Sequence, residues 1–394
     1  MHKHKRNSFK TLIEILIIST RLGFTSFGGP IAHLGYFYEE YIRKRKWLDE
    51  KSYADLVALC QFLPGPASSQ VGIGVMRGGL LGGIVSFLGF TLPSVLALIL
   101  FALLLKSTDI EQAGWIHGLK IVAVAVVAHA ITGMAQKLTP EVKRKTIALF
   151  ALVVSLLGQT AFAQAGIIII SAAIGFLLFK DSIDKKESAF HFPISKTFGT
   201  VCLSLFFVLL VLLPVLRESA DLRWLSMFDS FYRAGSLVFG GGHVVLPLLE
   251  REFVPSGMIS KEAFLAGYGA AQAVPGPLFT FAAYLGAVMG GWQGGMLAAI
   301  AIFLPAFLLI LGALPYWDVL RRNPNLKGAL AGVNAAVVGI LISAFYFPIW
   351  TSAILNPIDF AFAAILFSML AYWKLPPWVI VSTGVIGGFL LNLL

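Results

Sequence analysis

Charged residues are scarce in this chain of 394 residues. Asp, Glu, Lys and Arg make up 13% of it and hydrophobic residues 58%, whereas soluble domains average about 25% charged and about 45–50% apolar residues. Several apolar stretches exceed the ~18 residues that mark a membrane span, among them 79–105, 198–216 and 291–314. The scarcity of charge argues against a soluble protein and predicts an all-α polytopic membrane protein.

Cysteine and the common catalytic motifs are also rare or missing. The two cysteines, Cys60 and Cys202, both lie in apolar stretches, which argues against a disulfide framework and a cysteine-based metal site. The sequence contains no HExxH, Walker or GxSxG motif and no pair of carboxylates inside an apolar stretch. We therefore expect a protein that is not an enzyme and needs no metal or other cofactor.

The charge that is present is mostly positive, with a formal net charge of +10. In a soluble protein this excess would suggest a nucleic-acid partner. Here Lys and Arg gather in short loops between apolar stretches, as they do on the cytoplasmic side of membrane proteins. We expect a chain embedded in the lipid bilayer with its N-terminus in the cytoplasm and no nucleic-acid partner.

The two halves of the chain repeat one pattern. RLGFTSFGGPIAHLGYFYEE (21–40) aligns with RAGSLVFGGGHVVLPLLERE (233–252), and Gln-x-x-Pro-Gly-Pro occurs at 61–66 and again at 272–277. The stretch 78–100 aligns with 290–312 through Gly-Gly-x-x-Gly-Gly and Leu-Pro. The shared order of these motifs indicates an internal duplication.

A charged linker and one unpaired apolar stretch join the two copies. We divide the chain into an N-terminal repeat (1–180), a linker with a connecting helix (181–217) and a C-terminal repeat (218–394). One extra crossing between two copies inverts the second copy, which gives the inverted repeats common among secondary transporters. Inversion also allows the basic loops of both halves to face the cytoplasm together.

Each half contains two positions where an apolar helix should break. These are Phe-Gly-Gly at 27–29 and 239–241, and Pro-Gly-Pro at 64–66 and 275–277. The N-terminus and the basic loop at 43–46 flank one apolar stretch, yet both favour the cytoplasm. We therefore predict two re-entrant or broken-helix hairpins in each half, followed by about four spanning helices. Full spans are the alternative.

The breaks predict a site for an anion. Irregular backbone inside a membrane is tolerated only where it is buried in protein or lines a cavity. Half-helix N-termini present free N–H groups and the positive end of the helix dipole. The candidate substrate-binding residues lie in the breaks or beside them: Arg21, Phe27, Gly28, Gly29, Gln61, Gly65, Ser68, Ser69, Gln70, Arg233, Gly240, Gly241, Gln272 and Gly276.

Arg21 and Arg233 are repeat-equivalent, each six residues before its Phe-Gly-Gly. An intramembrane arginine costs at least ~2.5–3.5 kcal/mol and is normally paired or functional. The two guanidinium groups could hold a divalent anion, or they could pair with the equally repeated Glu40 and Glu252. The sequence leaves both interpretations open.

Other polar residues also have two interpretations. Gln61 and Gln272 either donate to the anion or cap free carbonyls at the breaks. His33 and His243 are not repeat-equivalent, and each is either a carrier of a coupled proton or a structural residue.

FGGPIAHLGYF, QFLPGPASSQ and FTLPS in the first half, with FGGGHVVLPLL and QAVPGPLFTFAAYLG in the second, resemble the chromate ion transporter family. The resemblance covers almost the whole chain in the long, two-domain form of that family. It implies export of chromate across a prokaryotic plasma membrane, chromate resistance, and sulfate as the related oxyanion. Carried over by motif, it places the substrate at 27–30, 61–66 and Gln70.

Two functions remain open at this point. In the first, the protein exports a divalent oxyanion by alternating access, and at 100 mV a dianion leaving the cell gains roughly 4.6 kcal/mol from the membrane potential. In the second, it is a membrane enzyme or scaffold that acts on anionic lipid head groups. Either a monomer or a homodimer is compatible with the sequence.

Overall fold

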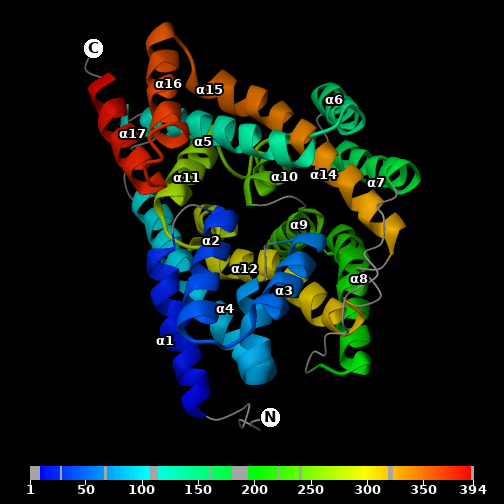
Figure 1. Cartoon of the computed structure of the whole chain (residues 1–394). Helices are drawn as coiled ribbons and strands as arrows, with labels where there is room; N and C mark the ends of the chain where they lie inside the picture. Colours follow the sequence, from blue (N-terminus) through cyan, green and yellow to red (C-terminus); the bar gives the residue numbers. More distant parts are fainter. Residues whose placement is uncertain are drawn as a thin grey trace.

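The computed structural model describes nine ranges of the chain, and every structural statement below concerns them. They are 9–26, 29–65, 69–106, 114–158, 161–179, 194–220, 222–238, 242–317 and 323–391. Regular structure in these ranges is helical throughout, as the sequence predicts. Figure 1 shows the arrangement of the helices.

The first half and the connecting helix begin with short helices and continue with long ones. Their bounds are α1 (Phe9–Thr25), α2 (Gly29–Phe37), the π-helix η1 (Tyr38–Lys44), α3 (Glu50–Phe62), α4 (Ser69–Lys106), α5 (Gly114–Leu138), α6 (Val142–Leu157), α7 (Ala161–Leu178) and the connecting α8 (Lys196–Ser219). Asp49 caps α3 by accepting a hydrogen bond from the backbone N–H of Ser52.

The second half follows the same order. Its elements are α9 (Arg223–Leu237), η2 (Gly242–Val244), α10 (Val245–Phe253), α11 (Lys261–Ala273), η3 (Leu278–Thr280), α12 (Phe281–Ala313), η4 (Leu314–Tyr316), α14 (Pro324–Ala344), η5 (Phe345–Trp350), α15 (Thr351–Ala353), α16 (Pro357–Ala371) and α17 (Pro377–Leu391).

Helices end at the positions where the sequence predicts breaks. In the first half α1 ends at Thr25 and α3 ends at Phe62; in the second, α9 ends at Leu237 and α11 at Ala273. A further sharp turn lies inside α4 at Gly78-Gly79, where the φ angle of Gly79 is 64°, and α12 turns in the same way at Gly290-Gly291. The repeat therefore extends to backbone conformation.

Contacts between α1 and the segment at and after η1 support the hairpin interpretation of the first break. Arg45, after η1, lies 3.4 Å from the carboxylate of Glu14 on α1. The Tyr41 and Ser19 hydroxyls, one turn further in, are 3.1 Å apart. The chain therefore returns toward the end of α1 from which it started. Whether these segments cross half or all of a membrane stays a prediction.

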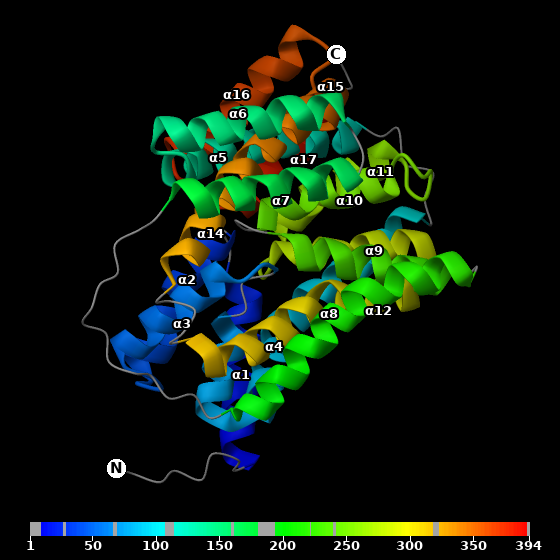
Figure 2. The ribbon, with the colours of Figure 1, turned by 90° about the vertical axis from the view of Figure 1, so that its right-hand side faces the viewer.

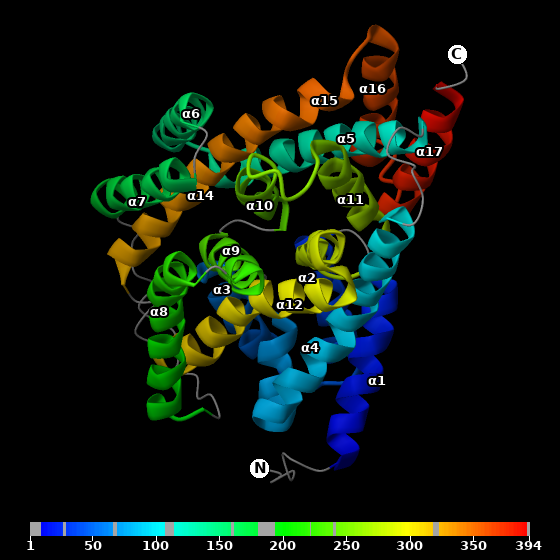
Figure 3. The same ribbon diagram turned by 180° about the vertical axis from the view of Figure 1, so that it is seen from behind.

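The two halves exchange helices. Helix α5 of the first half packs on α17 of the second half, where Gly118 faces Gly388. Helix α14 of the second half packs on α7 of the first half, where Gly332 faces Gly175. Close glycine contacts of this kind let helix backbones approach in membranes. Figure 2 and Figure 3 show α5, α7, α14 and α17 together above α1, α4, α8 and α12. Because each layer contains helices of both repeats, the domain boundaries at 180 and 217 stay a prediction.

Five helical segments are long and apolar enough to cross a membrane. The connecting helix α8 shows how such a segment divides its surface. It buries Gly199, Cys202, Phe206 and Leu213, while Val201, Leu205 and Val208 are exposed on another side. Exposed apolar side chains at helical spacing indicate contact with lipid rather than water. The prediction of a polytopic membrane protein is therefore confirmed.

Candidate anion-binding site

The two kinds of break meet across the repeats. The N–H of Gly276, in the second Pro-Gly-Pro, donates to the carbonyl oxygen of Ser26 beside the first Phe-Gly-Gly, at 2.9 Å. The N–H of Gly65, in the first Pro-Gly-Pro, donates to the carbonyl oxygen of Val238 beside the second, at 2.6 Å. We call the Ser26–Gly276 contact the first junction and the Val238–Gly65 contact the second junction. The sequence predicted convergence of the breaks, but not this exchange.

Both junctions need glycine. The φ angles of Gly65 and Gly276 are 102° and 108°, a region that residues with a Cβ rarely adopt. A Cβ on Gly276 would stand 2.8 Å from the Ser94 hydroxyl, and one on Gly65 would stand 3.1 Å from the Ala306 methyl group. The glycines therefore allow helices of opposite repeats to approach at the centre of the protein.

The first junction is rich in polar groups. Nε2 of His33 lies 3.2 Å from the Ser26 carbonyl oxygen, and its ring meets Phe90 edge-on, with centroids 5.2 Å apart. The carbonyl oxygen of Phe90 would lie 3.6 Å from a Cβ on Gly276. Thr91 follows in the chain, and its carbonyl oxygen accepts a hydrogen bond from the Ser94 hydroxyl at 2.9 Å.

Three buried polar atoms around this junction have no hydrogen-bond partner in the protein. They are the hydroxyl oxygens of Ser26 and Thr91 and the amide nitrogen of Gln272. The three residues expose 0%, 2% and 7% of their surface, and an unpaired buried donor costs about 1–3 kcal/mol. Of the three, only Gln272 belongs to a motif that the sequence repeats. Ser26 and Thr91 were missed because neither belongs to a repeated motif.

The repeated arginines form ion pairs with the repeated glutamates. Arg21 lies 2.6 Å from Glu40, and Arg233 lies 3.0 Å from Glu252. The structure thus shows the pairing of these arginines with Glu40 and Glu252, which is one of the two interpretations that the sequence leaves open. The other interpretation, contact of an arginine with the substrate, is left to a transport measurement on arginine variants.

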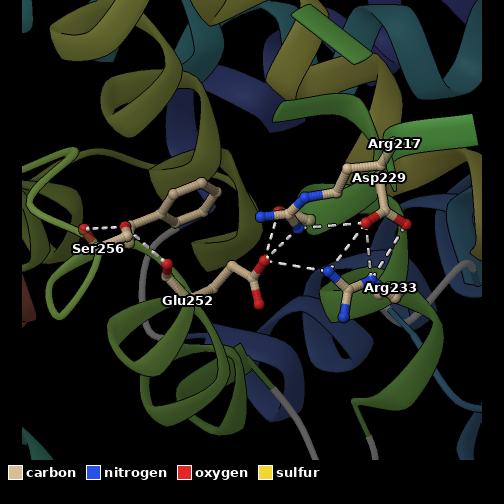
Figure 4. A network of polar contacts seen from close by, with 7 residues as sticks. Arg217, Asp229, Arg233, Glu252 and Ser256 are labelled. Carbon is tan, nitrogen blue, oxygen red and sulfur yellow. Dashed lines mark hydrogen bonds and ion pairs between the residues drawn. The ribbon is translucent and has the colours of Figure 1, made fainter. Parts of the chain in front are cut away.

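The second arginine belongs to a larger network, drawn in Figure 4. Arg233 also pairs with the fully buried Asp229 at 2.9 Å, and Arg217 pairs with Asp229 and Glu252 at 3.3 and 2.8 Å. Ser230 adds a hydroxyl that donates to Glu252 at 2.6 Å. Two arginines and two carboxylates balance here, so this network offers little spare positive charge for an anion.

The first arginine pair lies beside a basic loop. Arg45 donates to Glu40 at 3.0 Å, and Lys44 lies 3.7 Å away. Burial raises the pKa of Glu40, but the hydrogen bond from Arg45 and the charges of Arg21, Arg45 and Lys44 outweigh it, so this pKa lies below its usual value. Glu40 is therefore an ionised partner that holds these cations.

The remaining predicted residues are distributed around the junctions. Gln70 is buried in the first turn of α4, and its carbonyl oxygen accepts from Ser86 at 2.9 Å. Nδ1 of His243 lies 2.7 Å from the Tyr268 hydroxyl. Gly29 starts α2, Gln61 lies in the last turn of α3, and Ser69 starts α4.

Five predicted residues lie outside the described ranges: Phe27, Gly28, Ser68, Gly240 and Gly241.

Over the ranges that the structure describes, no three His, Cys, Asp or Glu side chains gather as a metal ion would require. The donors left without a partner at the first junction are the hydroxyls of Ser26 and Thr91 and the side-chain amide of Gln272.

Comparison with known proteins adds an independent line of evidence. A family model described as chromate transporter matches residues 13–176 and 225–389, one region in each half. A probable chromate transport protein of Synechococcus elongatus is 28% identical over 347 residues, which cover 87% of this chain and 85% of that protein. A chromate transport protein of Pseudomonas aeruginosa is 26% identical, over 82% of this chain and 77% of its own length.

A third relative carries a less specific name. An uncharacterized transporter of Methanocaldococcus jannaschii is 29% identical over 349 residues, which cover 86% of this chain and 84% of that protein. No solved structure matches the chain. The match of one family model to both halves confirms the predicted duplication, and the chain belongs to the chromate transporter family.

Proposed function

We propose that this protein exports chromate, or a closely related divalent oxyanion such as sulfate, from the cytoplasm by alternating access. The observation that carries the proposal is the reciprocal pair of hydrogen bonds at the two junctions. Sites formed between inverted repeats can open to either side when the repeats rock against each other. Family membership and the names of its relatives support chromate as the anion.

We further propose a prokaryotic plasma membrane and a cytoplasmic N-terminus. Residues in or near the loops expected in the cytoplasm make contacts across the chain: Glu14 meets Arg45 and Arg77, Arg144 lies over the Phe179 ring, and the Tyr316 hydroxyl donates to the Lys196 carbonyl oxygen. A basic set of loops on one side matches the charge bias of cytoplasmic loops.

Residues at or near the helix ends expected on the outer side also contact one another. Arg217 pairs with Glu252, Lys120 lies 3.9 Å from Glu262, and His117 lies 2.8 Å from Asp359. Each basic side chain in these outer contacts is paired with a carboxylate, so this side has no positive excess. Two sets of loops on opposite sides are what inverted repeats require, because the Arg21–Glu40 and Arg233–Glu252 pairs then lie on different faces.

The membrane potential alone provides a driving force for export. A dianion that leaves a negative interior gains roughly 4.6 kcal/mol at 100 mV, so no coupled ion is required. One chain provides both Phe-Gly-Gly and both Pro-Gly-Pro breaks, so we propose that a monomer is sufficient for transport.

The test is chromate uptake into everted membrane vesicles, which present the cytoplasmic face outward. A potential that is positive inside the vesicle should drive radiolabelled chromate inward, excess sulfate should compete, and vesicles without the protein should show neither effect. Absence of chromate and sulfate uptake under any potential or pH gradient would overturn the proposal. Activity on anionic lipid head groups would then be the function to assay.

A further inference from the structure

The two junctions differ in the chemistry that surrounds them, although the repeat makes them equivalent. Around the first junction stand Ser26, Thr91, Ser94 and His33, all buried. The aligned positions around the second junction carry Val238, Phe303, Ala306 and Val245, also buried. Four positions that carry polar residues around the first junction thus carry apolar residues around the second junction. The asymmetry cannot come from the backbone, because the backbone hydrogen bond is present at both junctions.

We propose that the oxyanion binds at the first junction alone, held by the neutral donors of Ser26, Thr91 and Gln272, and that the second junction is a packing contact. This inference rests on the proposed function and assigns its binding site. Each of the three donor residues is at least nine-tenths buried, and each donor atom lacks a partner in the protein. At the second junction the residues aligned with Ser26, Thr91, Ser94 and His33 are all apolar and offer no such atom, while the copy of Gln272 is Gln61, in the last turn of α3.

The three donors come from three helices that meet at Gly276. Ser26 follows α1 and accepts the Gly276 N–H through its carbonyl oxygen. Thr91 lies on α4 directly after Phe90, whose carbonyl oxygen faces Gly276. Gln272 lies in the last turn of α11, one turn before Gly276. A ligand at this point would therefore contact both repeats, as alternating access between them requires.

Neutral donors suit an anion that has to be bound and then released. A hydrogen bond to an ionised oxygen is roughly twice as strong as one between neutral groups. Hydroxyl and amide donors gain that strength from the substrate's own charge. A buried arginine in their place would add a full opposite charge at low dielectric and slow release. The chromate class of tetrahedral dianions offers four oxygen acceptors to such a donor set.

A purely structural role for these atoms makes a different prediction. Replacing an unpaired buried hydroxyl by a group of the same shape without it is nearly neutral or stabilising. Ser26→Ala and Thr91→Val should therefore raise the unfolding temperature or leave it unchanged, whichever role is correct. Only a binding role also predicts weaker binding of the anion.

The test is equilibrium binding of radiolabelled chromate to the purified full-length protein, measured together with its thermal unfolding. We expect Ser26→Ala and Thr91→Val each to weaken binding by about ten- to hundredfold, the loss that one hydrogen bond to a charged group represents. Thr91→Ser keeps the hydroxyl and should bind within a few fold of the wild type.

Ser171→Ala is the matched control. The Ser171 hydroxyl is likewise fully buried and unpaired, but it lies on α7, where α7 packs against α14. This variant should bind chromate as the wild type does.

The outcomes separate this inference from the function on which it rests. Wild-type affinity in folded Ser26→Ala and Thr91→Val would overturn the assignment of the site while the transporter function stands. Failure of the wild-type protein to bind or transport either chromate or sulfate would overturn both. An equal loss in Ser171→Ala would show that the effect is not local and would also overturn the assignment.

Discussion

At the residue scale, the two break glycines make the clearest prediction. Gly65→Ala and Gly276→Ala should each destabilise the protein, because a positive φ costs a residue with a Cβ about 1–2 kcal/mol. Gly276→Ala should lower the unfolding temperature more, since its Cβ would stand 2.8 Å from the Ser94 hydroxyl. Thermal unfolding of the purified variants measures both effects.

Gly133→Ala provides the control for these variants. Gly133 lies inside α5 with no atom within 4 Å of its Cβ position, and alanine favours a helix over glycine by roughly 1 kcal/mol. A loss of stability in Gly133→Ala as large as that at the breaks would contradict the role assigned to the positive φ.

The paired arginines also make a prediction at this scale. Arg233→Gln should destabilise the protein by about 3 kcal/mol, because it removes a partner from the buried Asp229. Arg21→Gln should cost about 1 kcal/mol or less, since the Arg21 side chain is 56% exposed and Glu40 keeps Arg45. Thermal unfolding compares the two variants.

Transport by the same variants then separates the two interpretations of the arginines. Because Arg21 pairs with Glu40 at 2.6 Å and the proposed site uses neutral donors, we expect folded Arg21→Gln to transport chromate like the wild type. Loss of transport in a stable Arg21→Gln protein would instead indicate contact with the substrate.

Residue patterns predicted the breaks but only part of the site around them. Proline fixes φ and glycine permits positive φ, so Pro-Gly-Pro and Phe-Gly-Gly could be interpreted as breaks without a structure. Ser26 and Thr91 could not be found by searching for repeated polar residues, because their copies are Val238 and Phe303. A signal was nevertheless present: a polar residue lies in an apolar segment, and the aligned position of the other repeat carries an apolar residue.

At the element scale, the exchanged helices depend on glycine contacts. A Cβ on Gly332 would meet the Ser171 carbonyl oxygen and stand 2.9 Å from the Gly175 Cα. Gly332→Leu should therefore separate α14 from α7 and destabilise the protein by about 1–3 kcal/mol or more. Yield of monodisperse protein and its unfolding temperature are the measurements, with Gly133→Leu, at an open position on α5, as the control.

Equal stability of Gly332→Leu and Gly133→Leu would contradict the exchanged packing. The sequence did not predict this exchange. Periodicity shows which helices are apolar, and it contains no information on which apolar helix packs against which. The sequence also did not predict the sharp turn at Gly78-Gly79, which brings Gly74 against Gly82.

At the scale of the whole molecule, the two sets of loops predict an orientation. In a Cys60→Ala/Cys202→Ala background, a membrane-impermeant maleimide applied to intact cells should label Glu262→Cys and leave Lys143→Cys unlabelled. Both side chains are exposed, so permeabilised cells should show labelling of both. Labelling of Lys143→Cys from outside would refute the proposed cytoplasmic position of the loop between α5 and α6.

The crossed hydrogen bonds have a consequence for the order in which the protein matures. The N–H of Gly65 is bonded to Val238, a residue that the ribosome adds only after the whole first repeat and the connecting helix. Until then the first Pro-Gly-Pro segment has no native partner for this group, at a place where an unbonded amide is costly. The first half should therefore stay unfinished, and open to insertion factors or quality-control proteases, until the second half has been synthesised.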